Sequence, residues 1–139
     1  MWVVLWFACV GKDEAVAAGP YDDYVWPDGA TAPKIFSAKI YCQSTDAGLQ
    51  TFLELEVNDP QGPYDIRQGI WKSYSPSNEL LAEDIMYCDL EKTCYYSFTP
   101  EQYPLLPCDQ LGSYTTEAQL EDYSGNFSEW VELEYLGIE

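Results

Sequence analysis

The stretch LQTFLELEV (Leu49–Val57) decides the class of fold. Within it the apolar residues Leu53, Leu55 and Val57 alternate with two glutamates. Successive side chains of a β-strand point to opposite faces, so this alternation places the apolar residues on one face and the glutamates on the other. One buried face and one solvated face are typical of an antiparallel sheet, and we therefore expect an all-β protein.

The same alternation returns near the end of the chain in WVELEY (130–135), where Val131, Leu133 and Tyr135 are expected to point inward. Apolar runs between turn signals define seven expected strands: 34–43, 49–58, 65–74, 79–88, 93–99, 112–122 and 127–136. About 105 residues, divided into short strands by turn-rich breaks, favour a seven-stranded antiparallel immunoglobulin-like sandwich over residues 34–139.

The first 33 residues differ in composition from the rest of the chain. Residues 1–8 contain the apolar run WVVLWFA, which is too short to span a bilayer and matches the apolar centre of a secretory signal peptide. Residues 9–33 are rich in Asp, Gly, Ala and Pro, so we expect them to form a flexible N-terminal tether.

An apolar run that ends in Phe7-Ala8-Cys9 and is followed by a polar segment resembles the lipobox of bacterial lipoproteins. In that family the signal peptide is cleaved before the cysteine, which then carries the lipid. The resemblance implies a protein of the bacterial cell envelope, on the outer surface or in the periplasm, that touches the membrane through a lipid on Cys9. The alternative is an apolar N-terminus that contains a free thiol.

A second resemblance lies at the other end of the chain. The segment DYSGNFSEWVELEY (122–135) is similar to the last hairpin of bacterial immunoglobulin-like and fibronectin-type-III-like surface domains. In these domains a turn of the form Asp-x-x-Gly-Asn is followed by Ser and a final alternating strand. The resemblance implies a fold and a surface setting, and no activity.

The remaining four cysteines test the expected topology, because four cysteines allow three pairings. Cys42 closes the first expected strand and Cys108 lies in the fifth connection, so both fall at one end of the sandwich. Cys88 and Cys94 flank a turn at the opposite end. The pairs Cys42–Cys108 and Cys88–Cys94 therefore keep each disulfide short enough to form. Free thiols in a cytosolic protein are the alternative, whereas a four-cysteine zinc site would need paired short spacings that are missing.

Charge and composition exclude several classes of function. The chain has 24 acidic and 6 basic residues, a net charge of -18, so its surface repels nucleic acid and anionic membranes. It contains no histidine, which removes the commonest general base and metal ligand. No nucleophile–base set can be named, and we expect a protein that is not an enzyme.

Two acidic turns form a candidate metal site. NDPQGPYD (58–65) and EDYSGN (121–126) would be neighbours at one end of the sandwich. The candidate ligands are Asp59, Asp65, Asp122 and Asn126, and Ca²⁺ is the natural ion because it prefers oxygen ligands. The alternative is that these side chains cap their own turns, with Gly62 and Gly125 supplying positive φ angles.

The aromatic residues are the other candidate for a binding function. Trp130 is expected to point outward, and with Tyr123 and Trp71 it could present a platform to sugar rings or to a protein. Alternatively, these rings cover the sheet as cross-strand pairs. We expect a monomeric, non-catalytic envelope module that presents loops or a sheet face to an envelope protein, or else a carbohydrate-binding module assisted by calcium.

Overall fold

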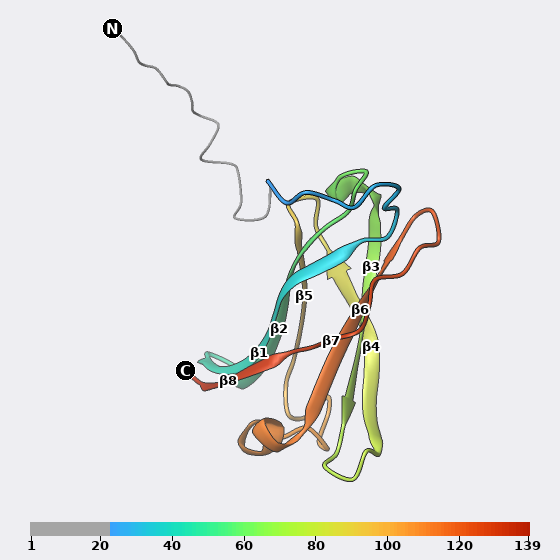
Figure 1. The fold of residues 1–139 in the computed structure, drawn as a ribbon. Helices are drawn as coiled ribbons and strands as arrows, with labels where there is room; N and C mark the ends of the chain where they lie inside the picture. Colours follow the sequence, from blue (N-terminus) through green and yellow to red (C-terminus); the bar gives the residue numbers. More distant parts are fainter. Residues whose placement is uncertain (1–22) are drawn as a thin grey trace, which may run out of the picture.

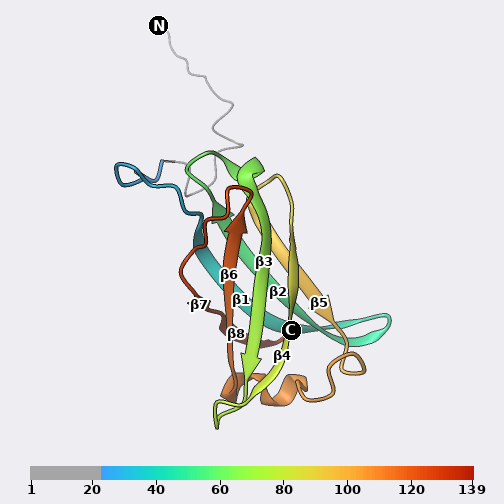
Figure 2. The same cartoon turned by 90° about the vertical axis from the view of Figure 1, so that its right-hand side faces the viewer.

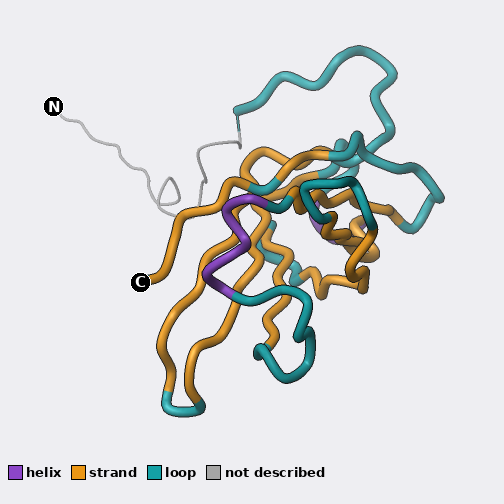
Figure 3. The backbone as a smooth tube through the Cα atoms, turned by 90° about the horizontal axis from the view of Figure 1, so that it is seen from below, coloured by secondary structure: helices purple, strands orange, loops and turns teal. Residues whose placement is uncertain are grey.

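The computed structural model describes residues 23–139, which form an all-β fold with two short 3-10 helices (Figure 1). The strands are β1 (Lys34–Thr45), β2 (Gly48–Asn58), β3 (Ile66–Tyr74), β4 (Leu80–Cys88), β5 (Thr93–Phe98), β6 (Thr115–Asp122), β7 (Val131–Glu132) and β8 (Glu134–Ile138). The helices are η1 (Pro63–Asp65) and η2 (Cys108–Ser113). They lie at opposite ends of the molecule, and Figure 3 shows η2 from its own end.

The strands form one mixed sheet in the order β7-β6-β3-β4-β5-β2-β1-β8. The sheet folds over so that β1, β2, β5 and β8 face β3, β4, β6 and β7 (Figures 1 and 2). The two halves are joined through β4 and β5 by two residue pairs, Tyr87 with Tyr95 and Cys88 with Cys94. The result is a nearly closed sheet with its core between the halves.

The alternation in β2 supplies part of this core. Leu53, Leu55 and Val57 are buried, while Glu54 is half-buried and Glu56 is exposed. Each of these glutamates lies on the face opposite the core, as the alternation predicts. The expectation of an all-β protein built on this pattern is confirmed.

The expected seven-stranded antiparallel immunoglobulin-like sandwich is wrong in strand number and in pairing. The structure has eight strands within residues 23–139, and β8 pairs with β1 in parallel. The difference arises where one strand was expected over 127–136. There the chain pairs first with β6 as β7, passes through buried Leu133, and then pairs with β1 as β8. The strand therefore moves from one half of the sheet to the other, which closes the fold on this side.

The other expected strands agree with the structure to within about three residues. The largest difference is at 112–122, where β6 begins at Thr115 because Cys108–Ser113 forms η2. The backbone N–H of Tyr114 donates to the carbonyl of Leu111, which ends this helix before the strand begins.

Both expected disulfides are present. Cys42 is joined to Cys108 with a Cα–Cα distance of 6.2 Å, and Cys88 to Cys94 with a distance of 3.9 Å. The first connects β1 to η2, and the second joins β4 to β5 where the two halves of the sheet meet.

The expected signal-peptide-like segment at 1–8 and residues 9–22 of the expected tether (9–33), including Cys9, lie outside the described residues. The described part of the expected tether contacts the β-domain. Tyr24 packs edge-on against Phe36 of β1 with ring centroids 5.1 Å apart, and Trp26 packs against Tyr24 at 5.0 Å. Across residues 23–139 we find no helix that is long and apolar enough to cross a membrane.

Candidate metal centre and exposed tyrosine face

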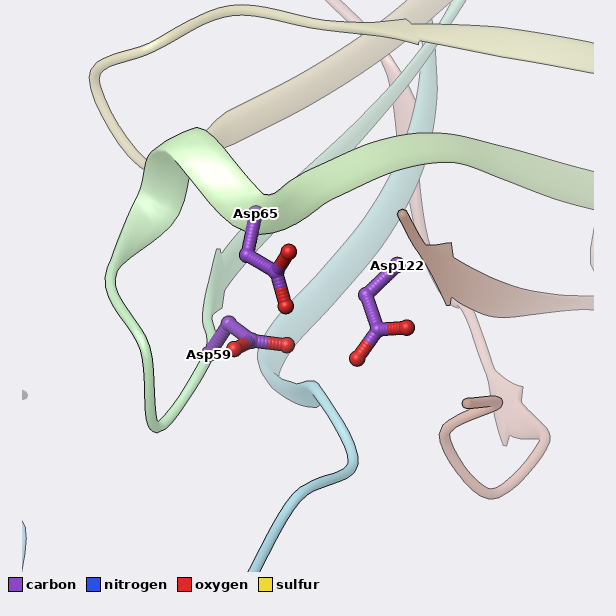
Figure 4. Close-up of side chains that lie close together, drawn as sticks. All are labelled: Asp59, Asp65 and Asp122. Carbon is purple, nitrogen blue, oxygen red and sulfur yellow. The ribbon is translucent and has the colours of Figure 1, made fainter. Parts of the chain in front are cut away.

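Three of the four expected metal ligands come together. Asp59 follows β2, Asp65 ends η1, and Asp122 ends β6. Each offers one carboxylate oxygen, and these three oxygens all lie within 4.8 Å of one another. Figure 4 shows the three side chains converging from the two connections at this end of the fold. We call Asp59, Asp65 and Asp122 the aspartate cluster.

Turn capping holds two members of the cluster in place. Oδ1 of Asp59 accepts a hydrogen bond from the backbone N–H of Gln61 at 2.9 Å. Oδ1 of Asp122 accepts from the N–H of Ser124 at 3.0 Å and from that of Asn126 at 2.7 Å. The predicted capping role is thus present, and it occupies one oxygen of each of these side chains.

The carboxylate oxygens that do not cap a turn include two that are buried without a hydrogen-bond partner among the described residues. Asp59 is 2% exposed and Asp122 is 1% exposed, so both carboxyl groups are buried. Oδ2 of Asp59 and Oδ2 of Asp65 are buried without a hydrogen-bond partner among the described residues. Burial, together with the nearby Asp65 and Asp122, raises the pKa of Asp59 from 3.8 to about 7. The cluster therefore brings three carboxyl groups close together, and two of their oxygens are buried without a hydrogen-bond partner among residues 23–139.

Asn126 is beside the cluster in a supporting role. Its side-chain Nδ2 donates to Oδ2 of Asp122 at 3.2 Å and to the carbonyl of Thr31 at 3.4 Å. The amide nitrogen of Asn126 is directed at the cluster, and its role as a ligand stays a prediction. Asn126 fixes the orientation of Asp122 through its backbone and its side chain.

The three aromatic residues expected at a binding surface lie in different environments. Trp71 is 0% exposed and stacks on Phe98, with ring centroids 5.7 Å apart and planes inclined by 9°. It is a core residue and cannot contact a ligand at the surface, which corrects that expectation. Trp130 is partly exposed, with the Lys72 ammonium 5.1 Å from its ring centre. Tyr123 is 68% exposed.

Tyr123 belongs to an apolar surface that the sequence analysis did not identify. This surface, which we call the tyrosine face, consists of Tyr64, Ile85, Tyr87, Leu90 and Tyr123. All five side chains are exposed, Tyr64 by 69%. They line a hollow of about 540 Å³ together with residues of β3. The alternation of Ile85 and Tyr87 around buried Met86 in β4 was the signal that could have revealed it.

Polar groups lie along one side of this hollow. Arg67 and Gln68 of β3 both contribute to its lining. The Gln68 amide donates to Glu121 of β6 at 3.0 Å, and the Arg67 guanidinium lies 3.4 Å from the same carboxylate. The tyrosine face thus combines exposed rings, aliphatic side chains and a fixed polar border.

A second hollow of about 510 Å³ lies on a different part of the surface. It is lined by most of residues 24–35, which include Tyr24 and Trp26, and by residues that include Phe127 and Val131. Because Thr31 lines it and accepts a hydrogen bond from Asn126, this hollow adjoins the loop that supports Asp122.

No protein-family model matches this chain, and no curated protein matches its sequence.

Proposed function

We propose that this chain is an exported, non-catalytic binding module of a bacterial cell envelope, anchored by a lipid on Cys9, and that its tyrosine face docks a partner protein. The observation that carries the proposal is the exposure of Tyr64, Tyr87 and Tyr123 around one hollow. Tyrosine is enriched at the energetic centres of protein interfaces, and contiguous exposed apolar surface marks interaction sites.

The aliphatic residues favour a protein over a glycan as the occupant. Ile85 and Leu90 are 55% and 57% exposed and lie in the same hollow as the tyrosines. Branched aliphatic side chains fit the apolar core of a protein interface, whereas sugar rings stack on flat aromatic faces. With a net charge of -18 on this chain, the partner is expected to surround its apolar centre with Lys and Arg.

Two disulfides support export. Disulfides persist in oxidising compartments such as the periplasm and the cell surface, and they are rare in the cytosol. The anchor is tested by the intact mass of the protein from the membrane fraction of its source. A chain that begins at Cys9 with an added lipid mass is expected, and an unlipidated chain that keeps Met1 would contradict the anchor.

The docking surface is tested by site-specific photo-crosslinking. A crosslinking residue at Tyr87 should capture one dominant envelope protein, and the same residue at Phe127, which is exposed on the second hollow, should not. With the captured partner purified, Tyr87→Ser and Tyr123→Ser should each weaken binding at least about tenfold, as expected for residues at the centre of an interface. Unchanged binding with both variants folded would refute the assignment of this face.

A glycan is the second candidate, favoured by the polar border of the hollow. Arg67 and Gln68 next to Tyr64 and Tyr123 provide both donors and stacking surfaces. Glycan-array binding that is lost on Tyr123→Ala would support this alternative. Loss on Trp130→Ala instead would place the sugar on the neighbouring surface of β3 and β7.

A further inference from the structure

The aspartate cluster contains buried carboxylate oxygens that lack a hydrogen-bond partner within residues 23–139. Asp59 is 98% buried, since its exposed fraction is 2%, and its Oδ2 has no hydrogen-bond partner within residues 23–139. Oδ2 of Asp65 is likewise buried and without a partner there. Leaving ionised carboxylate oxygens buried and unpaired is unfavourable, so buried charges in proteins are normally paired or coordinate a metal.

The geometry of the cluster fits a calcium ion. Ca²⁺ binds oxygen ligands at roughly 2.3–2.6 Å, so ligands on opposite sides of one ion lie about 5 Å apart. The three oxygens of the cluster lie within 4.8 Å of one another, and one ion can therefore contact all of them. The cluster consists of carboxylates alone, a donor set that suits Ca²⁺, whereas zinc sites are usually built from Cys and His.

We propose that Asp59, Asp65 and Asp122 bind one Ca²⁺ ion, which links the β2–β3 connection to the end of β6. The ion compensates the charge that the cluster concentrates and completes the coordination of the two unpartnered oxygens. Water molecules supply the remaining ligands on the side of Asp65, which is the most exposed of the three.

The surrounding hydrogen bonds prepare the cluster for this ion. Oδ1 of Asp59 and Oδ1 of Asp122 are fixed by backbone N–H groups, so these carboxylates are oriented before the ion arrives. The N–H of Tyr123 also donates to the carbonyl of Asp65 at 2.8 Å, which holds the two connections side by side. An ion site that is preorganised in this way loses little conformational entropy on binding.

Calcium binding also fixes part of the tyrosine face. Tyr64 directly precedes Asp65, and Tyr123 directly follows Asp122. The ion therefore sets the spacing between the backbones that carry these two exposed rings. This step rests on the proposed function, whereas the ion site itself does not depend on any partner.

Isothermal titration of the full chain with CaCl₂ at constant ionic strength tests the site. We expect one Ca²⁺ per chain with a dissociation constant on the order of 10⁻³ M or below, the range that covers extracellular calcium modules and sensors. Asp65→Asn should weaken binding at least tenfold. Asp46→Asn, which removes the same charge from the exposed β1–β2 turn, is the matched control and should bind as the wild type does.

Two results would overturn the proposal. One is the absence of saturable binding by the wild type, and the other is equal affinity of the wild type and Asp65→Asn. Equal affinity for Mg²⁺ and Ca²⁺ would overturn the choice of calcium. Asp65→Asn removes one charge from a like-charged cluster and Asp46→Asn removes one from an exposed turn, so both variants are expected to fold, and a thermal melt in EDTA verifies this.

Backbone NMR locates the ion without reference to any partner. Addition of CaCl₂ should shift the amide signals of Gln61, Ser124 and Asn126, whose N–H groups contact the cluster. The amide of Asn78, in the β3–β4 turn at the opposite end of the fold, should not move. Shifts spread evenly over the acidic surface would indicate non-specific screening and would contradict a defined site.

Discussion

Removal of the Cys42–Cys108 disulfide is expected to destabilise the domain more than twice as much as removal of Cys88–Cys94. The two disulfides close loops of 66 and 6 residues. On the chain-entropy account, cross-linking loops of these lengths stabilises the folded state by about 4 and about 2 kcal/mol at 25 °C, because the longer loop restricts the unfolded chain more.

The burial of Cys42 and Cys108 increases the difference in stability loss between removal of the two disulfides. Cys42 and Cys108 are both buried, and the hydroxyl of buried Thr51 shares its one hydrogen between their sulfur atoms, which lie 3.3 and 3.4 Å from its oxygen. Replacing both cysteines by alanine leaves that hydroxyl without these acceptors, which costs about 1–3 kcal/mol more. Cys88, by contrast, is half-buried at the join between β4 and β5.

The comparison is made by urea denaturation of two double variants, Cys42→Ala/Cys108→Ala and Cys88→Ala/Cys94→Ala. The first should lose about 5–7 kcal/mol and the second about 2 kcal/mol of unfolding free energy. The urea dependence of the unfolding free energy should also rise more in the first, because its unfolded state expands further. Equal losses, or a larger loss in the second variant, would refute the loop-closure reasoning.

Three further predictions concern single side chains. Asp84 accepts hydrogen bonds from Tyr96 and Tyr103, and the Tyr96 bond contributes most to lowering the pKa of Asp84 below 3.8. Its contribution to stability is therefore present above pH 3.8 and lost as the pH falls through the lowered pKa of Asp84. Asp84→Asn should melt earlier than the wild type at pH 6, and this difference in melting temperature should shrink as the pH falls below 3.8. Trp71→Ala should cost about 3–5 kcal/mol in urea denaturation, because it empties a fully buried ring site, and Trp71→Phe should cost much less. Asp59→Asn should stabilise the calcium-free protein in EDTA at pH 8 by up to about 4 kcal/mol. The reason is that the pKa of Asp59 is raised to about 7, so the stability of the wild type falls as the pH rises from 3.8 to 7. At pH 4 the gain in melting temperature should vanish.

The strands could be predicted from the sequence because their signal is local. Alternation of apolar and charged residues in 49–57 requires only that one face is buried and the other solvated. The disulfide partners followed from the direction of successive strands, which alternates along the chain. This reasoning needs only the end at which each cysteine lies, so it succeeded although the fold is not the expected seven-stranded antiparallel sandwich.

The exchange of partners between β7 and β8 could not be predicted. The alternation in 130–135 continues through Leu133 without a break, because Leu133 is buried whichever neighbour the strand has. The pairing of β8 with β1 depends on contacts between segments about 95 residues apart in sequence. An alternating sequence pattern indicates which face of a strand is buried, but it does not indicate which strand pairs with it.

The burial of Trp71 and of Asp59 also could not be predicted from the sequence pattern. In β3 both faces carry apolar residues, since Trp71 lies on one face and Ile70 and Tyr74 on the other, so alternation alone could not decide which ring is buried. Asp59 lies in a turn, where an acidic residue is normally solvated. It is buried, and the hydrogen bond from the Tyr123 N–H to the Asp65 carbonyl shows that the end of β6 lies against the β2–β3 connection, an approach set by the tertiary fold.

The two disulfides have different roles in this fold. Cys42–Cys108 ties η2 to the core across a long loop and so contributes mainly to global stability. Cys88–Cys94 closes a short loop, yet it lies at the two-pair join between the halves of the sheet. Cys88 also lines the hollow of the tyrosine face, directly after Tyr87, whose ring packs edge-on against Tyr95 at 5.3 Å. The short disulfide thus holds the strand edge that carries the proposed docking surface, where a sheet joined by so few backbone pairs would otherwise open most readily.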